Sequence, residues 1–469
     1  MKIKNLRAFA LFPIAFSLLA STAFAQDAAG SWVGKLRVPG AELRVIVEVQ
    51  KAADGSLSGT LQSPDQSPQK LPLTTIAVKD GVMTFTLDAF KIAYEGRWDA
   101  ARKTWVGTTT QAGAPLPLDL EAATPTNTAA PVKPKRPQVE AIKAAPVPYV
   151  ERTLSFDNPD APGVSLAGVF STPMGKGPFP AVVLVSGSGP HTRDEVVYGH
   201  KVFLVLRDHL TRQGFAVLSY DKRGVGESKG DYASATSYDF ASDAAAALAT
   251  LKKQPEVNPR KLGLIGHSEG GLIGPVVASR TQDLAFMVLM AGPGIQGDAL
   301  LAEQTARIAE ASGMPSSNVP ALQQFQFMLY QAVHQSKTKA EFRDRLIALR
   351  NTPGAPPIAD SQIDGFVDEL YTPWMRAFLA HDPASSLKAM TMPVLVLNGD
   401  KDLQVLADSN VGGLRKSLAH NPKARFVVLK DHNHLFQRAK TGLPQEYGQI
   451  EETLSPEFLQ TVTEWLKSQ

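Results

Sequence analysis

Hydrophobic and polar residues alternate with a period of two along the first quarter of the chain. Residues 43–49 and 83–87 follow this pattern, and the turn pairs Asp54-Gly55 and Asp80-Gly81 precede strand-like runs. Such alternation buries one face of a strand, and Asp-Gly is a hairpin turn signal. The pattern predicts successive hairpins that form a small antiparallel β-barrel or meander domain over residues 26–121.

Three tryptophans, Trp32, Trp98 and Trp105, fall within these predicted strands. One interpretation is a ligand-binding barrel, because the opening Gly30-Ser-Trp-Val-Gly34 loosely resembles lipocalin-type and avidin-type barrels. The other is that the indole rings fill the core, which is the usual place of aromatic residues in strands. We favour the second interpretation and expect an accessory domain.

The pattern of hydrophobic and polar residues changes after this domain. Residues 122–149 are rich in Ala, Pro, Thr and Lys without an apolar period, which predicts a linker. Beyond it, short apolar runs alternate with helical periods, a pattern typical of a mostly parallel sheet with crossover helices. We therefore expect an α/β catalytic domain with eight strands, formed by residues 150–294 and 391–469.

The connection after the sixth predicted strand is about a hundred residues long, far longer than an ordinary loop. Its amphipathic helical periods predict a helical cap over residues 295–390. Aromatic and sulfur-containing side chains of this segment either line an acyl pocket or hold the cap together, and both interpretations stay open. They are Tyr330, Phe366, Tyr371, Trp374, Met375 and Phe378.

The start of the chain predicts export. Residues 1–25 combine three basic residues, an apolar run interrupted by Pro13, and small residues that end at Ala25. This is the pattern of a signal peptide cleaved after Ala25, and the apolar run is too short for a membrane anchor. We expect a periplasmic or extracellular protein, and the sequence does not separate the two.

Charge and cysteine content narrow the chemistry. The chain has 48 basic and 45 acidic residues, and cleavage would remove three basic residues and no acidic one. A neutral mature protein gives no reason to expect nucleic acid or an anionic membrane as a partner. The sequence contains no cysteine, which excludes disulfides, thiolate catalysis and zinc-thiolate sites.

The sequence Gly266-His-Ser268-Glu-Gly270 follows an apolar strand and precedes a helical period. A G-x-S-x-G pattern in that context predicts a nucleophile elbow, in which a tight turn exposes the serine hydroxyl and the glycines allow close backbone approach. The alternative is a glycine-rich turn with an incidental serine. Its context decides in favour of Ser268 as the nucleophile.

An acid and a base follow in the required chain order. Asp402 follows the seventh predicted strand in Gly399-Asp-Lys-Asp402, and one turn of the loop can bring its carboxylate back over the strand end. Asp400 is the alternative acid, or a turn-capping residue. The order Ser, acid, His is the one found in α/β-hydrolases, whereas chymotrypsin and subtilisin use other orders.

Two histidines follow the last predicted strand, and a third precedes the serine. We predict His434 as the base because it lies at the far end of the loop before an apolar anchor, with His432 as a structural or pocket-lining residue. His267 is interpreted as a packing residue. The backbone N–H groups of Glu269 and of Ser188, in a glycine-rich loop after the third strand, are the predicted oxyanion donors.

Charged residues also follow strand ends: Arg193, Asp194, Asp221 and Arg223. They could bind a polar substrate, but we expect them to form internal ion pairs that brace the loops.

Five motifs in order resemble those of bacterial serine carboxylesterases of the α/β-hydrolase superfamily. They are Ser186-Gly-Ser-Gly-Pro with Arg-Asp-Glu after it, Tyr220-Asp-Lys-Arg-Gly-Val-Gly-Glu-Ser228, Gly-His-Ser-Glu-Gly-Gly, Asn398-Gly-Asp-Lys-Asp-Leu-Gln-Val, and Asn433-His-Leu-Phe-Gln. The resemblance covers about residue 150 to the end of the sequence. It implies a Ser-His-Asp triad, no cofactor or metal, and hydrolysis of small carboxylic esters with short acyl chains.

Three alternatives stay open. The same branch is similar to dienelactone hydrolases, acyl-CoA thioesterases and prolyl-oligopeptidase-like peptidases, so the substrate could be a thioester or an amide. A non-enzymatic alternative is a ligand-binding protein that uses the β-domain. The sequence leaves the oligomeric state open.

Overall fold

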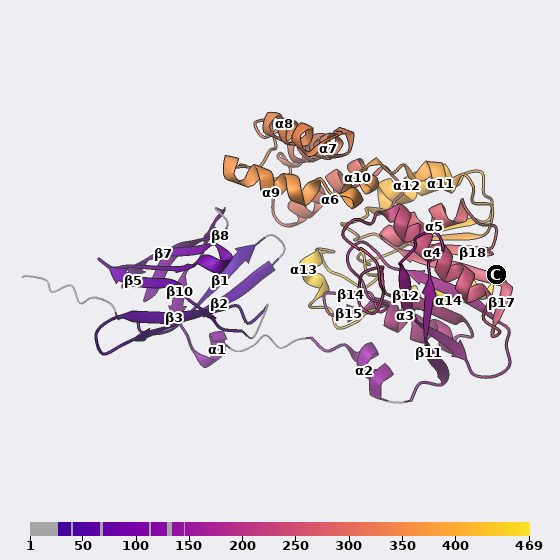
Figure 1. Cartoon of the computed structure of the whole chain (residues 1–469), viewed down its shortest axis with the longest axis horizontal. Coiled ribbons are helices and arrows are strands. Elements are labelled where there is room, and N and C mark those ends of the chain that lie inside the picture. Colours follow the sequence, from indigo (N-terminus) through magenta and orange to yellow (C-terminus); the bar gives the residue numbers. More distant parts are fainter. Residues whose placement is uncertain (1–26, 39–40, 66–68, 112–113, 129–133, 145) are drawn as a thin grey trace, which may run out of the picture. The chain divides into compact units, whose positions relative to one another are not determined.

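The computed structural model describes residues 27–469 except 39–40, 66–68, 112–113, 129–133 and 145 (Figure 1). The chain divides into two compact units, with the boundary between Pro131 and Val132. The predicted signal peptide, residues 1–25, lies outside the described residues.

Within the described residues, the first unit is an antiparallel sheet of ten strands in the order β4-β3-β2-β1-β10-β8-β7-β6-β5, with β9 paired to β8. The strands are β1 (Gly30–Val38), β2 (Ala41–Lys51), β3 (Leu57–Gln62), β4 (Leu71–Pro72), β5 (Thr75–Lys79), β6 (Val82–Leu87), β7 (Ile92–Asp99), β8 (Thr104–Gln111), β9 (Ala114–Pro117) and β10 (Leu120–Ala122). Only Leu73 and Thr74 separate β4 from β5, although these strands lie at opposite ends of the order. Leu73 N–H donates to Gly59 of β3 and Thr74 N–H to Thr86 of β6, so the sheet curls back on itself.

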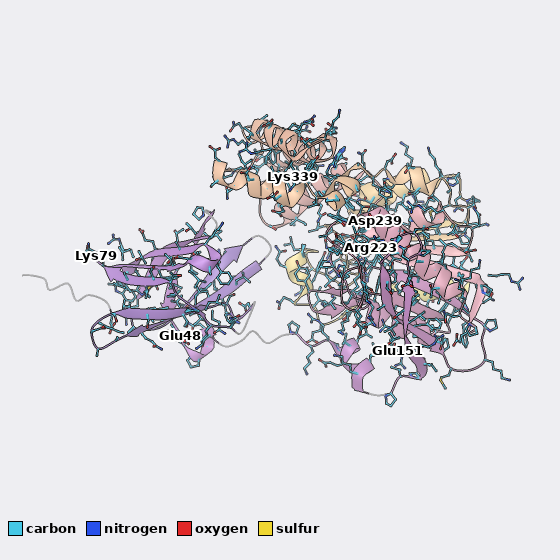
Figure 2. The ribbon with its side chains drawn as sticks, viewed as in Figure 1. Glu48, Lys79, Glu151, Arg223, Asp239 and Lys339 are labelled. Atoms are coloured by element: carbon cyan, nitrogen blue, oxygen red, sulfur yellow. The ribbon has the colours of Figure 1, made fainter. Side chains whose placement is uncertain are left out.

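Side chains fill the inside of this curled sheet. Val45, Val47 and Val49 of β2 point inward, whereas Glu48, labelled in Figure 2, lies on the other face and pairs with Lys70 at 2.7 Å. The ring centroids of the three tryptophans lie between 5.1 and 6.0 Å apart. Trp32 and Trp105 are buried and Trp98 packs against the same core, as the core interpretation predicts.

The second unit contains, in its described residues, an eight-stranded sheet in the order β11-β12-β16-β13-β17-β18-β19-β20. The strands are β11 (Tyr149–Asp157), β12 (Ser165–Pro173), β13 (Phe179–Val185), β16 (Ala216–Tyr220), β17 (Val257–His267), β18 (Phe286–Met290), β19 (Val394–Gly399) and β20 (Ala424–Leu429). β12 is antiparallel to both of its neighbours, and the other neighbouring pairs are parallel. The carboxyl ends of the parallel strands therefore meet at one edge.

Helices cover both faces of this sheet. They are α3 (Val202–Arg212) and α14 (Pro456–Lys467) on one face, and α4 (Ser237–Lys252), α5 (Glu269–Ala278) and α12 (Ala407–Ser417) on the other. Successive residues of β13 point to opposite faces of the sheet. Val183 packs in the core with α4 and α5, and Val182 packs in the core with α3 and α14. The short apolar runs of the sequence thus become strands that are buried on both faces.

The predicted linker, residues 122–149, contains more structure than its composition indicates. It includes α1 (Pro125–Thr128) and α2 (Pro137–Ala144), and Val139 of α2 is buried in the core of the second unit. Arg136 donates to the carbonyl oxygens of Tyr198, Gly448 and Ile450 at 2.9 to 3.2 Å. An eight-residue helix with one buried apolar residue shows no period, so sequence reasoning missed it.

A helical segment separates β18 from β19. Its described helices are α6 (Gly297–Ala311), α7 (Val319–Gln335), α8 (Lys339–Leu349), α9 (Asp360–Leu370), α10 (Pro373–Ala380) and α11 (Pro383–Leu387). α7, α8 and α9, drawn in orange in Figure 1, share a core of their own around Phe325, Phe342 and Val367. In the described part of the chain, no helix has the length and apolar character needed to cross a membrane.

Candidate active site

Ser268 lies at the sharp turn between β17 and α5, with φ 53° and ψ −117°. A non-glycine residue rarely adopts such a conformation, and the strain is held by tight packing of the backbone around it. A Cβ atom on Gly266 would lie 2.1 Å from the carbonyl oxygen of Gly270. A Cβ atom on Gly270 would lie 2.1 Å from that of Val185. The two glycines of the motif are therefore required by backbone contact.

His434 and Asp402 form a buried pair at the carboxyl edge of the sheet. His434 Nδ1 donates to Asp402 Oδ2 at 2.8 Å. The other carboxylate oxygen of Asp402 accepts the backbone N–H groups of Gln404 and Val405 at 2.8 and 2.9 Å. The acid is held in place by its own loop, and Nε2 of the imidazole remains available.

Asp400 and His432, the neighbours of the predicted acid and base, have other hydrogen-bond partners. Asp400 is exposed and accepts the backbone N–H of Asp431 at 2.6 Å, which is the capping role considered for it. His432 is fully buried between the carbonyl oxygen of Lys430 and the hydroxyl of Ser455, at 2.7 and 2.6 Å. Its ring supports the loop.

Ser268 and His434 line one cavity of about 320 Å³. Its lining residues are Gly187, Ser188, His191, Glu195, Val196, Val197, Tyr198, His267, Ser268, Gln404, His434 and Leu435. Among the hydrogen bonds of the described residues, none joins Ser268 Oγ to His434. In enzymes without bound substrate this contact is often long and tightens in the substrate complex.

The two predicted oxyanion donors flank the serine. The Gly187 N–H donates to Glu195 Oε1 at 2.7 Å, whereas the next N–H, that of Ser188, has no acceptor among the described residues. Glu269 is the first residue of α5, so its N–H belongs to the unpaired first turn of a helix. Both groups are free to bind an anionic oxygen.

A buried contact between Glu195 and His267, two residues that line the cavity, was not predicted from the sequence. His267 Nδ1 donates to Glu195 Oε1 at 2.9 Å and its Nε2 donates to the carbonyl oxygen of His434 at 3.1 Å. Burial lowers the pKa of His267, but the charge and hydrogen bond of Glu195, together with the bond to the His434 carbonyl and the charge of Asp402, outweigh burial and leave that pKa raised. His267 was predicted to pack, and its ring lies beside the His434 ring, with ring centroids 4.9 Å apart.

The outer wall of the cavity comes from a small hairpin, β14 (Val196–Val197) and β15 (His200–Lys201). Val196, Val197 and Tyr198 line the cavity, and sequence reasoning missed all three. None of the six cap residues considered for an acyl pocket lines it. Four of them pack in the cap's own cluster, which favours the interpretation that they hold the cap together. The other two, Trp374 and Phe378, stack on each other at 5.2 Å and pack against the core that contains α4 and α5.

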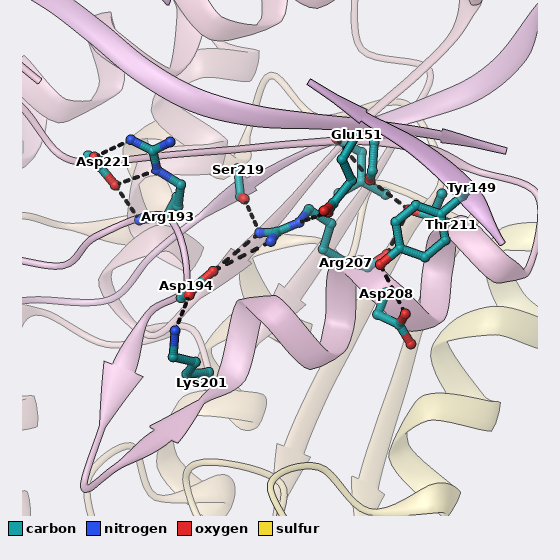
Figure 3. Close-up of polar contacts among 12 residues, drawn as sticks. Tyr149, Glu151, Arg193, Asp194, Lys201, Arg207, Asp208, Thr211, Ser219 and Asp221 are labelled. Atoms are coloured by element: carbon teal, nitrogen blue, oxygen red, sulfur yellow. Dashed lines mark hydrogen bonds and ion pairs between the residues drawn. The ribbon is translucent and has the colours of Figure 1, made fainter. Parts of the chain in front are cut away.

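The charged residues after the strand ends form the expected internal pairs. Figure 3 shows Arg193 against Asp221, at 2.6 Å, and Asp194 between Lys201 and Arg207, at 2.7 and 3.5 Å. These pairs brace the loops around the hairpin.

Arg223 belongs to a neighbouring cluster. It pairs with the buried Asp243 of α4 at 2.7 Å. It also lies 3.7 Å from Asp239 of the same helix, and Figure 2 labels Arg223 and Asp239. No group of three or more His, Asp or Glu residues in the described part of the chain could hold a metal ion.

Part of the chain is similar in sequence to known proteins. Residues 178–355 match the family model described as serine aminopeptidase, S33. Esterase EstD of Thermotoga maritima is 28% identical over 294 residues. The second unit has the α/β-hydrolase fold, and its sequence is similar to that of a bacterial esterase. The predicted α/β-hydrolase fold, preceded by an antiparallel β-unit, is thereby confirmed, as is the resemblance to bacterial esterases.

The extent of these similarities is limited. The match to EstD spans 62% of this α/β-hydrolase chain and 63% of the length of EstD. Among solved structures, esterase Pf2001 of Pyrococcus furiosus has a TM-score of 0.42 at 16% identity and covers 68% of this chain and 91% of its own. Est1E of Butyrivibrio proteoclasticus, with ferulic acid bound, has a TM-score of 0.40 at 17% identity and covers 67% and 96%.

Proposed function

We propose that the protein is a serine hydrolase that cleaves small carboxylic esters through a Ser268-His434-Asp402 triad. The observation that carries the proposal is the 2.8 Å bond between Asp402 and His434 at a cavity that Ser268 also lines. The bond holds the imidazole with Nε2 directed away from the acid, in the tautomer that can accept a proton. The similarity to EstD supports an ester as the substrate.

The reaction follows from this arrangement. His434 Nε2 removes the proton of Ser268 as the oxygen attacks the ester carbonyl, and Asp402 stabilises the resulting imidazolium. The N–H groups of Ser188 and Glu269 bind the oxyanion of the tetrahedral intermediate. His434 then protonates the leaving alcohol, and water repeats the sequence on the acyl-enzyme to release the acid.

The test is hydrolysis of p-nitrophenyl butyrate by the wild-type protein and by Ser268→Ala. We expect the variant to lose about 10⁴-fold or more of kcat/KM, because the nucleophile is gone. Its Tm should stay near that of the wild type, since alanine keeps the backbone contacts of the turn. Retained turnover in Ser268→Ala would refute the triad.

A second candidate is an aminopeptidase, which the description of the matching family favours. Such an enzyme needs an acidic group that recognises a substrate amine. Glu195 lines the cavity, but its carboxylate already pairs with His267, so we rank this activity below ester cleavage. Assays with aminoacyl-p-nitroanilides beside p-nitrophenyl esters and thioesters distinguish the candidates.

We also propose that the protein is exported after removal of residues 1–25. The charge and length of the first segment support this. N-terminal sequencing of the protein from its native cell should give Gln26 as the first residue, and an intact Met1 would contradict the proposal.

A further inference from the structure

Lys222, which the mechanism above does not use, lies buried between the two segments that carry the proposed oxyanion donors. It follows β16 and is 3% exposed. Its ammonium donates to the carbonyl oxygen of Gly187 at 2.6 Å and to Glu269 Oε2 at 3.0 Å. Gly187 and Ser188 line the cavity and Lys222 does not, so the ammonium approaches this peptide from behind.

The first contact controls the direction of the Ser188 N–H. The carbonyl of Gly187 and the N–H of Ser188 are the two ends of one trans peptide, since the cis bond found in the described residues is Gly177-Pro178. A trans peptide is planar, and its C=O and N–H point in opposite directions. Fixing the carbonyl oxygen with a charge-assisted hydrogen bond therefore fixes the N–H toward the cavity and also polarises it.

The second contact acts on the other donor. The buried Glu269 carboxylate accepts Lys222 Nζ through one oxygen, and the hydroxyl of Ser237 and the indole N–H of Trp374 through the other, both at 2.6 Å. Glu269 is also the first residue of α5, so anchoring its side chain holds the first turn of that helix. The N–H next to the nucleophile is held with it.

We propose that Lys222 is a positioning residue that aligns both oxyanion donors of Ser268. The proposal rests on the proposed ester hydrolysis. A buried ion pair is a costly way to gain stability alone, and Arg223, the next residue, already braces the same loop through Asp243 without touching the elbow or Gly187. Lys222 differs from Arg223 in bonding to both donor segments.

The experiment replaces Lys222 with methionine, which keeps the length of the side chain and removes the charge. We expect kcat for p-nitrophenyl butyrate to fall about 10²-fold, the loss typical of one oxyanion donor, with KM changed less than about threefold. Affinity for an alkyl trifluoromethyl ketone, which forms a tetrahedral oxyanion on the serine, should fall in proportion to kcat/KM.

Two further variants separate positioning from stability. Arg223→Met removes another buried cation, 6% exposed, from the same loop, and should lower Tm while leaving kcat near the wild-type value. The double variant Lys222→Met/Glu269→Gln no longer buries an unpaired carboxylate, so its Tm should recover relative to Lys222→Met. Its kcat should stay low, because the Gly187 carbonyl still lacks its ammonium partner.

The outcomes are distinct. Positioning by Lys222 is overturned if Lys222→Met keeps its kcat, if the double variant recovers kcat together with Tm, or if Arg223→Met loses as much kcat as Lys222→Met. If the wild type shows no Ser268-dependent ester turnover, the proposed function fails and the role of Lys222 fails with it.

Discussion

Asp400 and Asp402 are two residues apart, yet only Asp402 reaches the imidazole of His434. The difference lies in the loop, whose N–H groups at Gln404 and Val405 hold the Asp402 carboxylate over the strand end. Asp400 turns outward and caps the backbone at Asp431. The pair offers a matched comparison of two carboxylates in one loop.

We expect Asp402→Asn to lower kcat for p-nitrophenyl butyrate by about 10⁴-fold, because an amide no longer fixes the imidazole tautomer. Asp400→Asn should keep kcat within about threefold of the wild type, since its side chain acts only on the loop backbone. Steady-state kinetics of both variants check this. An equal loss in both would show that the loop, and not the carboxylate, matters.

At this scale the sequence predicts contacts that follow from local geometry. The glycines at 266 and 270, the serine between them and the loop histidine can be identified because each depends on a few neighbouring residues. Glu195 and His267 are 72 residues apart, and their contact depends on how the end of β17 meets the loop after β13. A single sequence carries no signal for this contact in the cavity wall, so sequence reasoning missed it.

At the scale of elements, the hairpin β14–β15 forms a wall of the cavity. One interpretation of the sequence assigned this role to the cap. The apolar runs of the sheet and the helical periods of the cap are long enough to be recognised from their pattern. A two-residue strand is too short to show a hydrophobic period. The sequence therefore gives no indication that Val196, Val197 and Tyr198 line a cavity. Which element borders the cavity depends on tertiary packing.

Tyr198→Ala should widen the cavity and shift preference toward longer acyl chains. We expect the ratio of kcat/KM for p-nitrophenyl hexanoate over acetate to rise about tenfold, the usual value of one or two buried methylenes. The matched control is Met375→Ala in the cap, which should leave the ratio unchanged. A shift in the control alone would return the acyl pocket to the cap.

At the scale of the whole molecule, the two units have separate hydrophobic cores. The composition and the hydrophobic pattern of the sequence predict this division. They place the end of the linker at residue 149, which is later than the start of the second unit in the structure. α2 lies within the predicted linker and belongs to the second unit, because Val139 is buried there and the side-chain amide of Gln138 bonds to the backbone of Thr453 and Leu454.

Two truncations test where the second unit begins. Residues 132–469 should fold with a Tm near that of the full chain and keep Ser268-dependent ester turnover. Residues 149–469 lack α2 and Arg136, and each lost hydrogen bond costs about 1 kcal/mol, so their Tm should be clearly lower. Thermal unfolding of both fragments gives the answer, and equal Tm values would contradict a structural role for α2.

The bonds of Arg136 also have a mechanical consequence. Among the described residues, the chain that enters the second unit is first held at this guanidinium, which donates to the Tyr198 carbonyl at the tip of the hairpin beside the cavity. We expect tension applied through the preceding chain to act first on the three carbonyl groups that Arg136 binds, of which that of Tyr198 lies beside the cavity. The hairpin that lines the cavity is therefore among the first parts of the second unit to bear such tension.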